Sequence, residues 1–325
     1  MPDDVVLAID VGGTKSAVGL VRRDGEVLSS RRRPAGVERG PLPMIGDYVE
    51  MAREVMADAR LPTSDIRGVG VGCGGPLDPN TGMVYSPANL PGWDELPLAS
   101  LLEGNLGLPV WIDNDANAAA LAEYWLGAGR GCDPMIYFTI STGVGGGVIL
   151  GGTVYRGATG NAGELGHMIV QAGGRRCNCG SRGCLEAYCS GTSIAARAQE
   201  ALARASESAL GRLGRPPRAE DVIALAKQGD ALAGQLWNET LDFLAAGVVS
   251  ALHAFEPRTI VLGGGVTRAG QDLFAPLQER VDALAMPRLA ASTKIVGAEL
   301  GDDVGILGAA AVALSRGEGL FPGAR

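Results

Sequence analysis

Short apolar runs separated by glycine-rich turns open the chain, and the same arrangement returns in its middle. Residues 5–10 (VVLAID) are apolar and β-branched, the next apolar run is 16–21 (SAVGLV), and a third strand candidate is 26–30. A second series begins at 135–141 (MIYFTIS), passes through TGVGGG and continues at 148–150. Such runs predict two β-meanders. Because the copies lie about 130 residues apart, we predict two domains built on one plan, each opening with a hairpin directed at a common cleft.

Helix-period and strand-like segments alternate between these copies. Apolar residues at helical spacing predict a helix over 43–59, and residues 66–73 (IRGVGVGC) and 109–115 (PVWIDND) are strand candidates. An alanine-rich helix is predicted over 116–127, closed by Gly127. Strands joined by helices form parallel sheets. The acids and the asparagine of residues 113–115 are therefore expected at the carboxyl end of a strand, where ligands bind in open α/β sheets.

The C-terminal half is mainly helical. Helical patterns cover residues 192–254, with a break at 211–218 that is rich in glycine and proline. The segments that follow are a strand leading into a glycine loop (259–265), an amphipathic helix (270–285), a last strand (294–300) and a helix of small residues (305–316). We expect this last helix to cross back to the first domain and so form a hinge.

Composition narrows the class of protein. The 325 residues are 46% hydrophobic and 20% charged, and no apolar run approaches the ~20 residues of a membrane span, so no membrane partner is expected. A net charge of -8 argues against a nucleic-acid partner. The acidic N-terminus lacks the basic start and long apolar core of a signal peptide, which indicates a cytoplasmic location. Cys73, Cys132 and Cys189 lie in apolar or glycine-rich surroundings typical of reduced thiols.

Three glycine-rich loops follow apolar strands. The first, DVGGTK, lacks the spacing of a Walker loop, but amides bared by glycine, a threonine hydroxyl and a lysine can cradle phosphates, while the acid holds hydrated Mg²⁺. An ordinary tight hairpin with an incidental acid is the alternative. The candidate nucleotide-binding residues of the three loops are Asp10, Gly12, Gly13, Thr14 and Lys15, then Thr142, Gly143, Gly145 and Gly146, and finally Gly264 and Gly265, whose flat backbone suits a purine. Together these loops predict a nucleotide bound between two domains.

Asn114 and Asp115 are candidates for the reacting end of the site. An aspartate at a strand terminus can accept a proton from a hydroxyl that attacks phosphorus, a step worth ~10² to 10⁴ in rate. Phosphoryl transfer otherwise needs positioning and charge neutralisation. The alternative is that Asp113 or Asp115 caps the following helix. Of the two aspartates, we expect Asp115 to be the base.

The stretch from Glu164 to Glu186 (ELGHMIVQAGGRRCNCGSRGCLE) carries a candidate metal site. The spacing H-x9-C-x-C-x4-C supplies one imidazole and three thiols, the donor set of a closed tetrahedral structural zinc site, from His167, Cys177, Cys179 and Cys184. Four unrelated residues are the alternative interpretation. Since Glu164 and Glu186 flank these donors closely, one Zn²⁺ ion would fix the positions of both carboxylates.

In combination, the motifs resemble the ROK family of sugar kinases over nearly the whole chain. The matching segments are D-x-G-G-T-K at 10–15, G-x-x-G-P at 72–76, N-D-A-N-A-A-A at 114–120, T-G-V-G-G-G at 142–147, E-x-G-H at 164–167 and C-x-C-G-x-x-G-C-x-E at 177–186. The segments L-G-G-G-V at 262–266 and G-D-D-V-G-I-L-G-A-A at 301–310 resemble the bacterial glucokinase branch of that family.

The resemblance implies an α/β protein with the two-domain actin-like ATPase (hexokinase/ribonuclease H-like) fold and an interdomain cleft. We place the N-terminal domain at 1–128 plus 303–325 and the C-terminal domain at 129–302. The implied reaction is ATP-dependent phosphorylation of glucose at its 6-hydroxyl, with Asp115 as base, Mg²⁺ as cofactor, and the zinc ligands named above. The implied sugar ligands are Gly75, Asn89, Asn114, Asp115, Glu164, His167 and Glu186. With one nitrogen of His167 on zinc, its other nitrogen would be a donor to the sugar. A homo-oligomer, dimer or tetramer, is expected.

The sequence also allows other substrates and other classes of function to be considered. The double glycine at Gly74 and Gly75 is closer to N-acylmannosamine kinases, so N-acetylmannosamine, N-acetylglucosamine or fructose is an alternative substrate. The family also includes sugar-sensing repressors, which carry a DNA-binding segment before the first phosphate loop. Because nine residues precede Asp10, we expect an enzyme. A filament or chaperone ATPase would not need the hydroxyl-binding residues or the zinc ligands.

Overall fold

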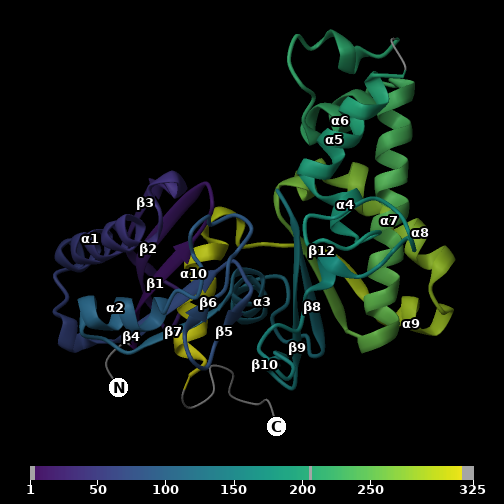
Figure 1. Cartoon of the computed structure of the whole chain (residues 1–325). Helices are drawn as coiled ribbons and strands as arrows, with labels where there is room; N and C mark the ends of the chain where they lie inside the picture. Colours follow the sequence, from purple (N-terminus) through teal and green to yellow (C-terminus); the bar gives the residue numbers. More distant parts are fainter. Residues whose placement is uncertain (1–3, 205–206, 317–325) are drawn as a thin grey trace. The chain divides into compact units, whose positions relative to one another are not determined.

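A computed structural model describes residues 4–204 and 207–316, which form two compact units (Figure 1). Within these residues, the first unit runs to Gly131 and also contains Gly147–Gly163 and the chain from Glu299 onward, while the second contains Cys132–Gly146 and Glu164–Ala298. The domain limits proposed from the sequence remain a prediction, and the part of 303–325 beyond Arg316 lies outside the described residues.

The first unit is built on a five-stranded sheet in the order β3-β2-β1-β4-β7. The meander predicted from the apolar runs is confirmed as β1 (Val5–Val11), β2 (Lys15–Arg22) and β3 (Val27–Pro34). Strands β4 (Ile66–Cys73) and β7 (Val110–Asn114) continue the sheet in parallel with β1. The carboxyl ends of β1, β4 and β7 therefore lie along one edge.

Helices cover both faces of this sheet. Side chains alternate between the two faces of a strand, so a central strand such as β1 packs its side chains against helices on both sides. Val5, Leu7 and Ile9 of β1 share a buried core with α1 (Pro41–Ala59) and α2 (Leu98–Leu106). Helix α10 (Val304–Leu314) contacts β1 and β4, and packs on α3 (Asp115–Trp125). A Cβ on Gly70 would collide with the carbonyl oxygen of Ala309, so the close approach of α10 requires glycine there. The predicted return of the last helix to the first unit is confirmed.

The second sheet repeats the plan of the first, with strand order β10-β9-β8-β11-β12. Its strands are β8 (Met135–Ile140), β9 (Val144–Leu150), β10 (Thr153–Val154), β11 (Thr259–Gly263) and β12 (Lys294–Gly297). Strand β9 begins inside the stretch predicted as a glycine loop, because Ser141 donates to the Gly143 carbonyl and closes the hairpin early. The internal repeat predicted from the sequence is confirmed.

Helices dominate the rest of the second unit. They are α4 (Glu186–Cys189), α5 (Gly191–Leu202), α6 (Ala219–Lys227), α7 (Ala231–Phe255), α8 (Gln271–Leu284) and α9 (Pro287–Ser292). Figure 1 shows α7 as the long helix beside α5 and α6. The break predicted at 211–218 falls between the end of α5 and the start of α6.

Two elements of the first unit escaped the sequence analysis, namely α2 and the small hairpin of β5 (Leu77–Asp78) and β6 (Met83–Val84). Short 3-10 turns connect other elements at 37–39, 63–65, 165–167, 209–212, 265–269 and 301–303. Among the described residues, no helix combines the length and apolar character needed to cross a membrane.

Candidate functional site

Strand register brings the candidate acids of the first unit to one edge of its sheet. Asp10 of β1 pairs with Gly72 of β4, which in turn pairs with Asp113 of β7. One residue further along, Cys73 pairs with Asn114. Asp115 follows immediately as the first residue of α3. The first phosphate-loop candidate and the proposed base thus meet at the edge where ligands bind in such sheets.

Asn114, rather than either aspartate, caps α3. Its Oδ1 accepts hydrogen bonds from the amides of Ala116 at 2.8 Å and Asn117 at 3.4 Å. The Asp115 Oδ1 also accepts from the Ala116 amide at 2.8 Å. Asp115 is exposed to solvent as a residue. The protein around its carboxylate nevertheless removes part of the hydrating water, and this desolvation raises the pKa of Asp115. An accessible carboxylate with a raised pKa is suited to accept a proton.

Asp10 lies at the end of β1, next to the loop of Gly12, Gly13 and Thr14. Burial raises the pKa of Asp10 to about 6, and the negative charge of Asp115 adds to the rise, while Lys15 and Arg32 oppose it. Thr14 and Lys15 are exposed at the hairpin. A carboxyl group whose ionisation is disfavoured by burial and by a neighbouring carboxylate forms an environment that a divalent cation would stabilise.

The loop that carries Asn89 packs on both the first hairpin and the loop after β4. A Cβ built on Gly13 would lie 3.1 Å from the Cβ of Asn89, and one built on Gly74 would lie 3.0 Å from the Asn89 Oδ1. Buried Leu90 and Trp93 anchor this loop to the core, while Asn89 itself is exposed. The structure therefore places Asn89 beside Gly74.

In the second unit, the β8–β9 hairpin is held by the segment after the candidate metal ligands. Glu186 accepts a hydrogen bond from the amide of Val144 through Oε2 at 3.0 Å, and a Cβ on Gly143 would lie 2.7 Å from the same oxygen. Thr192 donates to the carbonyl of Thr142 at 2.9 Å. Gly145 and Gly146 lie within β9. Glu186 thus links two motifs that lie far apart in the sequence.

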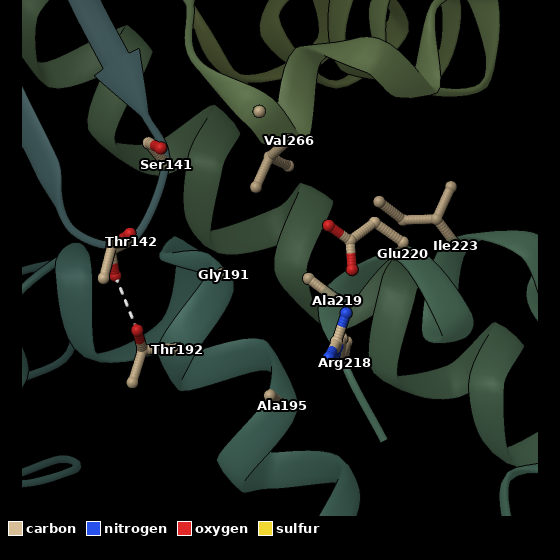
Figure 2. Close-up of a pocket in the computed structure, with 11 residues that line it drawn as sticks. Ser141, Thr142, Gly191, Thr192, Ala195, Arg218, Ala219, Glu220, Ile223 and Val266 are labelled. Carbon is tan, nitrogen blue, oxygen red and sulfur yellow. Dashed lines mark hydrogen bonds between the residues drawn. The ribbon is translucent and has the colours of Figure 1, made fainter. Parts of the chain in front are cut away.

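A pocket of about 290 Å³ lies beside this hairpin (Figure 2). Ser141 and Thr142 come from the end of β8, and Gly265 and Val266 come from the loop after β11. The remaining lining residues are Gly191, Thr192 and Ala195 of α5 and Arg218, Ala219, Glu220 and Ile223 at the start of α6. Figure 2 shows Thr142 and Thr192 on one side, with Ile223 and Glu220 on the other. The volume approaches the range of about 300–1,000 Å³ typical of small-molecule sites.

Gly264 explains why two of the predicted loops meet at this pocket. Its φ of 91° lies in the region that favours glycine, and a Cβ there would collide with the backbone of Ile140. The loop after β11 can therefore lie directly on the end of β8. The contributions of α5 and α6 were missed in the sequence analysis, because Arg218, Glu220 and Ile223 belong to no motif.

The four candidate zinc ligands are brought together. The ligand atoms of His167, Cys177, Cys179 and Cys184 all lie within 4.8 Å of one another. His167 Nδ1 is 3.7 Å from the Cys177 Sγ, and the Sγ atoms of Cys179 and Cys184 are also 3.7 Å apart. Tetrahedral zinc with ordinary bond lengths separates its ligand atoms by about 3.5–3.8 Å, so the donors fit that ion. Burial raises the pKa of Cys177 to about 12, so a thiolate there needs a neighbouring cation.

Each of the two carboxylates of this region lies close to one member of the cluster. The Nε2 of His167, the nitrogen that does not face Cys177, is 3.9 Å from Glu164 Oε2. Cys177 Sγ donates to Glu186 Oε1 at 3.6 Å. Both acids therefore lie close to the candidate metal ligands.

The proposed site residues separate into two groups. Asp10, Gly12, Gly13, Thr14, Lys15, Gly75, Asn89, Asn114 and Asp115 lie in the first unit, and the other proposed residues lie in the second.

Comparison with known proteins finds similarity to sugar kinases over nearly the whole chain. The ROK family model matches residues 6–316. A glucokinase of Thermotoga maritima is 38% identical, covering 97% of this chain and 99% of that protein. An N-acetylmannosamine kinase of an Escherichia coli strain is 34% identical, covering 94% and 97%.

Solved structures of sugar kinases of this family are also similar to this chain. The ROK hexokinase of Thermus thermophilus has a TM-score of 0.81 at 35% identity, covering 95% of this chain and 97% of that one. A ROK family glucokinase of Streptomyces griseus, solved with glucose and AMPPNP, has a TM-score of 0.78 at 31% identity, covering 94% and 98%. These structures confirm the mixed α/β, actin-like ATPase fold expected from the motifs. The chain belongs to the ROK family.

Proposed function

We propose that this protein is an ATP-dependent kinase that phosphorylates glucose at its 6-hydroxyl. The observation that carries this proposal is Asp115, an accessible carboxylate with a raised pKa, held by α3 at the carboxyl edge of the first sheet. The glucokinases of Thermotoga maritima and Streptomyces griseus support glucose as the sugar.

In the proposed reaction, the Asp115 carboxylate accepts the proton of the sugar 6-hydroxyl as its oxygen attacks the γ-phosphorus of ATP. A new bond forms between this oxygen and phosphorus while the bond from phosphorus to the β,γ-bridging oxygen breaks, and ADP leaves. Asp115 then returns the proton to solvent. The carboxylate must be ionised to act as a base, so the reaction slows as the pH falls through its raised pKa.

The nucleotide would bind to the glycine loops. We propose that the pocket beside Thr142 holds the adenosine, since its apolar walls include Ile223 and Val266. Amides at Gly12, Gly13, Gly143, Gly145 and Gly146 would donate to phosphate oxygens, with Lys15 adding positive charge. When bound, Mg²⁺ would neutralise charge on the phosphates, and Asp10 is the residue that would hold its hydration shell.

The sugar hydroxyls would be bound by the remaining proposed ligands. Asn114 uses Oδ1 to cap α3, and we propose that its Nδ2 donates to the sugar. Gly75, Asn89, Glu164, His167 and Glu186 complete the proposed set. With Nδ1 of His167 on the metal, its Nε2 would carry the proton and donate to a hydroxyl.

The metal proposed for the cluster of His167 and the three cysteines is Zn²⁺ in a structural role. Its support is the donor set and the separations described above. The ion would hold Glu164 and Glu186 in place and take no part in phosphoryl transfer. A homo-oligomeric state and a cytoplasmic location belong to the same proposal, and light scattering of the purified protein tests the first.

Asp115→Asn tests the proposed base. ATP-coupled turnover of glucose should fall ~10² to 10⁴-fold, while glucose affinity and folding persist because asparagine keeps the shape of aspartate. Asp24→Asn, at an exposed turn, is the matched control and should retain wild-type turnover. Near-normal turnover by Asp115→Asn would show that another group is the base.

A second candidate substrate is N-acetylmannosamine. The observations that favour it are the Gly74–Gly75 pair and the 34% identity to the Escherichia coli N-acetylmannosamine kinase. Against it, the Asn89 side chain lies beside Gly74, where we propose that an acyl group would have to lie.

A further inference from the structure

Asp113 is a fully buried carboxylate, 0% exposed, that the proposed reaction does not use. Its Oδ2 accepts from both Nε and Nη2 of Arg156, each at 2.7 Å. Its Oδ1 accepts from the Asn114 amide at 2.8 Å and from the Asn117 Nδ2 at 3.0 Å. Every contact of this carboxylate is therefore with a nitrogen donor, and one donor is a guanidinium.

These contacts surround the dipeptide Asn114–Asp115. Asp113 and Asn114 end β7, and Asn117 lies in the first turn of α3. The Asp113 carboxylate thus joins the strand end to the helix start, and the proposed base lies between the two attachment points. A change in its position would turn the first residues of α3, including Asp115.

The positively charged guanidinium of Arg156 allows the Asp113 carboxylate to be buried in ionised form. An ionised carboxylate without a partner is costly to bury, so it would take up a proton or move. Arg156 lies just beyond β10, and its Nη1 donates to the Val154 carbonyl at 3.4 Å, which fixes the guanidinium plane. A planar guanidinium can give two donors to one carboxylate, which a lysine cannot do in the same geometry.

We propose that Arg156 and Asp113 are a positioning pair for the catalytic base. The inference rests on the proposed function, in which Asp115 accepts the proton. The pair touches neither sugar nor nucleotide, and it acts by fixing the start of α3. Displacement of a reacting group by about 1 Å can reduce turnover ~10²-fold, so the pair should affect kcat more than nucleotide binding.

The test compares steady-state kinetics of full-length variants whose folding is checked by thermal unfolding. Arg156→Met should lower kcat for glucose about 10²-fold and leave the KM for ATP within about twofold. Arg156→Lys should give an intermediate kcat, because it restores the charge without the paired donors. Arg22→Met is the control, since Arg22 has similar exposure and surface ion pairs with Asp24 and Glu26, and it should retain wild-type kcat.

The double variant Asp113→Asn with Arg156→Met distinguishes a coupled pair from two separate effects. Because no unpaired charge stays buried, its kcat should exceed that of Arg156→Met alone. A wild-type kcat in folded Arg156→Met would overturn the inference. This holds also if the melting temperature of that variant is lowered, because the pair would then contribute to stability alone. If Arg156→Met does not fold, the kcat of Asp113→Asn provides the test instead. A wild-type kcat in that variant would overturn the inference.

The parallel measurement on Asp115→Asn separates the two proposals. If Asp115→Asn retains turnover, the assignment of Asp115 as the base fails, and the positioning inference fails with it. If Asp115→Asn is inactive while folded Arg156→Met turns over normally, only the positioning inference fails.

Discussion

At the scale of single residues, Asp10 and Asp115 lie at the same sheet edge and both have raised pKa values. Burial is the main cause for each, and the charge of Asp115 adds to the rise at Asp10. Cys73, between them in the sheet, has its thiol pKa raised by burial and by both acids. The fold therefore keeps negative charge at this edge at a cost in stability, which a bound cation would offset.

Asp10→Asn should stabilise the protein in the absence of nucleotide and Mg²⁺. Burial raises the pKa of Asp10 to about 6 in the folded chain, against an ordinary value of 3.8. As the pH rises from 3.8 to 6, the unfolded chain loses this proton first, so the folded state is progressively penalised. Above pH 6 the penalty is complete and amounts to at most about 3 kcal/mol. Urea unfolding at pH 8 should show the variant to be the more stable protein, with a smaller gain at pH 5.

The same substitution should abolish the response to Mg²⁺. Asparagine provides no charge for the cation, so turnover should fall sharply although the protein is more stable. A variant less stable than wild type at pH 8 would contradict the raised pKa.

At the scale of elements, α3 connects the proposed base to the point where the chain returns to the first unit. Asp115 is its first residue, and Glu123, near its end, is fully buried. The Glu123 carboxylate accepts from the amides of Glu299 and Leu300, each at 3.1 Å, and of Ala128 at 2.9 Å. This helix therefore anchors the segment that leads into α10.

Glu123→Gln should destabilise the protein by about 2–4 kcal/mol, because a neutral amide replaces an acceptor-only carboxylate that faces three amide donors. Chemical denaturation measures this loss. Glu279→Gln on the exposed face of α8 is the matched control, and we expect a change within about 0.5 kcal/mol. Equal stability of the two variants would show that Glu123 does not anchor the returning chain.

The stretch between Glu164 and Glu186 has little regular structure of its own, so its order should depend on the proposed metal. Cys179→Ser should lower bound zinc and raise the KM for glucose, since structural zinc contributes on the order of 10 kcal/mol in small zinc domains. Metal analysis and glucose titration measure the two effects, with Cys132→Ser, outside the cluster, as the control. Fully active wild-type protein without zinc would refute the structural role.

At the scale of the whole molecule, the sequence predicted the repeated sheet because apolar runs and glycine turns are local signals. It also predicted that His167 and the three cysteines cluster, because these residues lie close in sequence. The pairing of Arg156 with Asp113 spans 43 residues and has no local signal, since a sequence does not show which acid an arginine meets. The wall of the pocket formed by α6 was missed for the same reason, because Glu220 and Ile223 are ordinary helix residues until the chain folds.

Substrate choice also belongs to this scale, because overall sequence similarity separates the candidate sugars only weakly. Identity is 38% to the Thermotoga maritima glucokinase and 34% to the Escherichia coli N-acetylmannosamine kinase, so a few positions must decide. A Cβ built on Gly74 would lie 3.0 Å from the Asn89 Oδ1, so this side chain would compete with an acyl group for the space beside Gly74. We therefore expect kcat/KM for glucose to exceed that for N-acetylmannosamine by at least about 10-fold.

A panel of glucose, N-acetylmannosamine, N-acetylglucosamine, mannose and fructose with ATP measures this preference. Asn89→Ala opens the space beside Gly74, so it should narrow the ratio while lowering turnover of glucose through the lost amide. Asn105→Ala, at an exposed position of α2, is the matched control and should leave the ratio unchanged. Faster phosphorylation of N-acetylmannosamine by the wild-type protein would mean that Asn89 moves aside when the sugar binds, and the second candidate would then replace glucose.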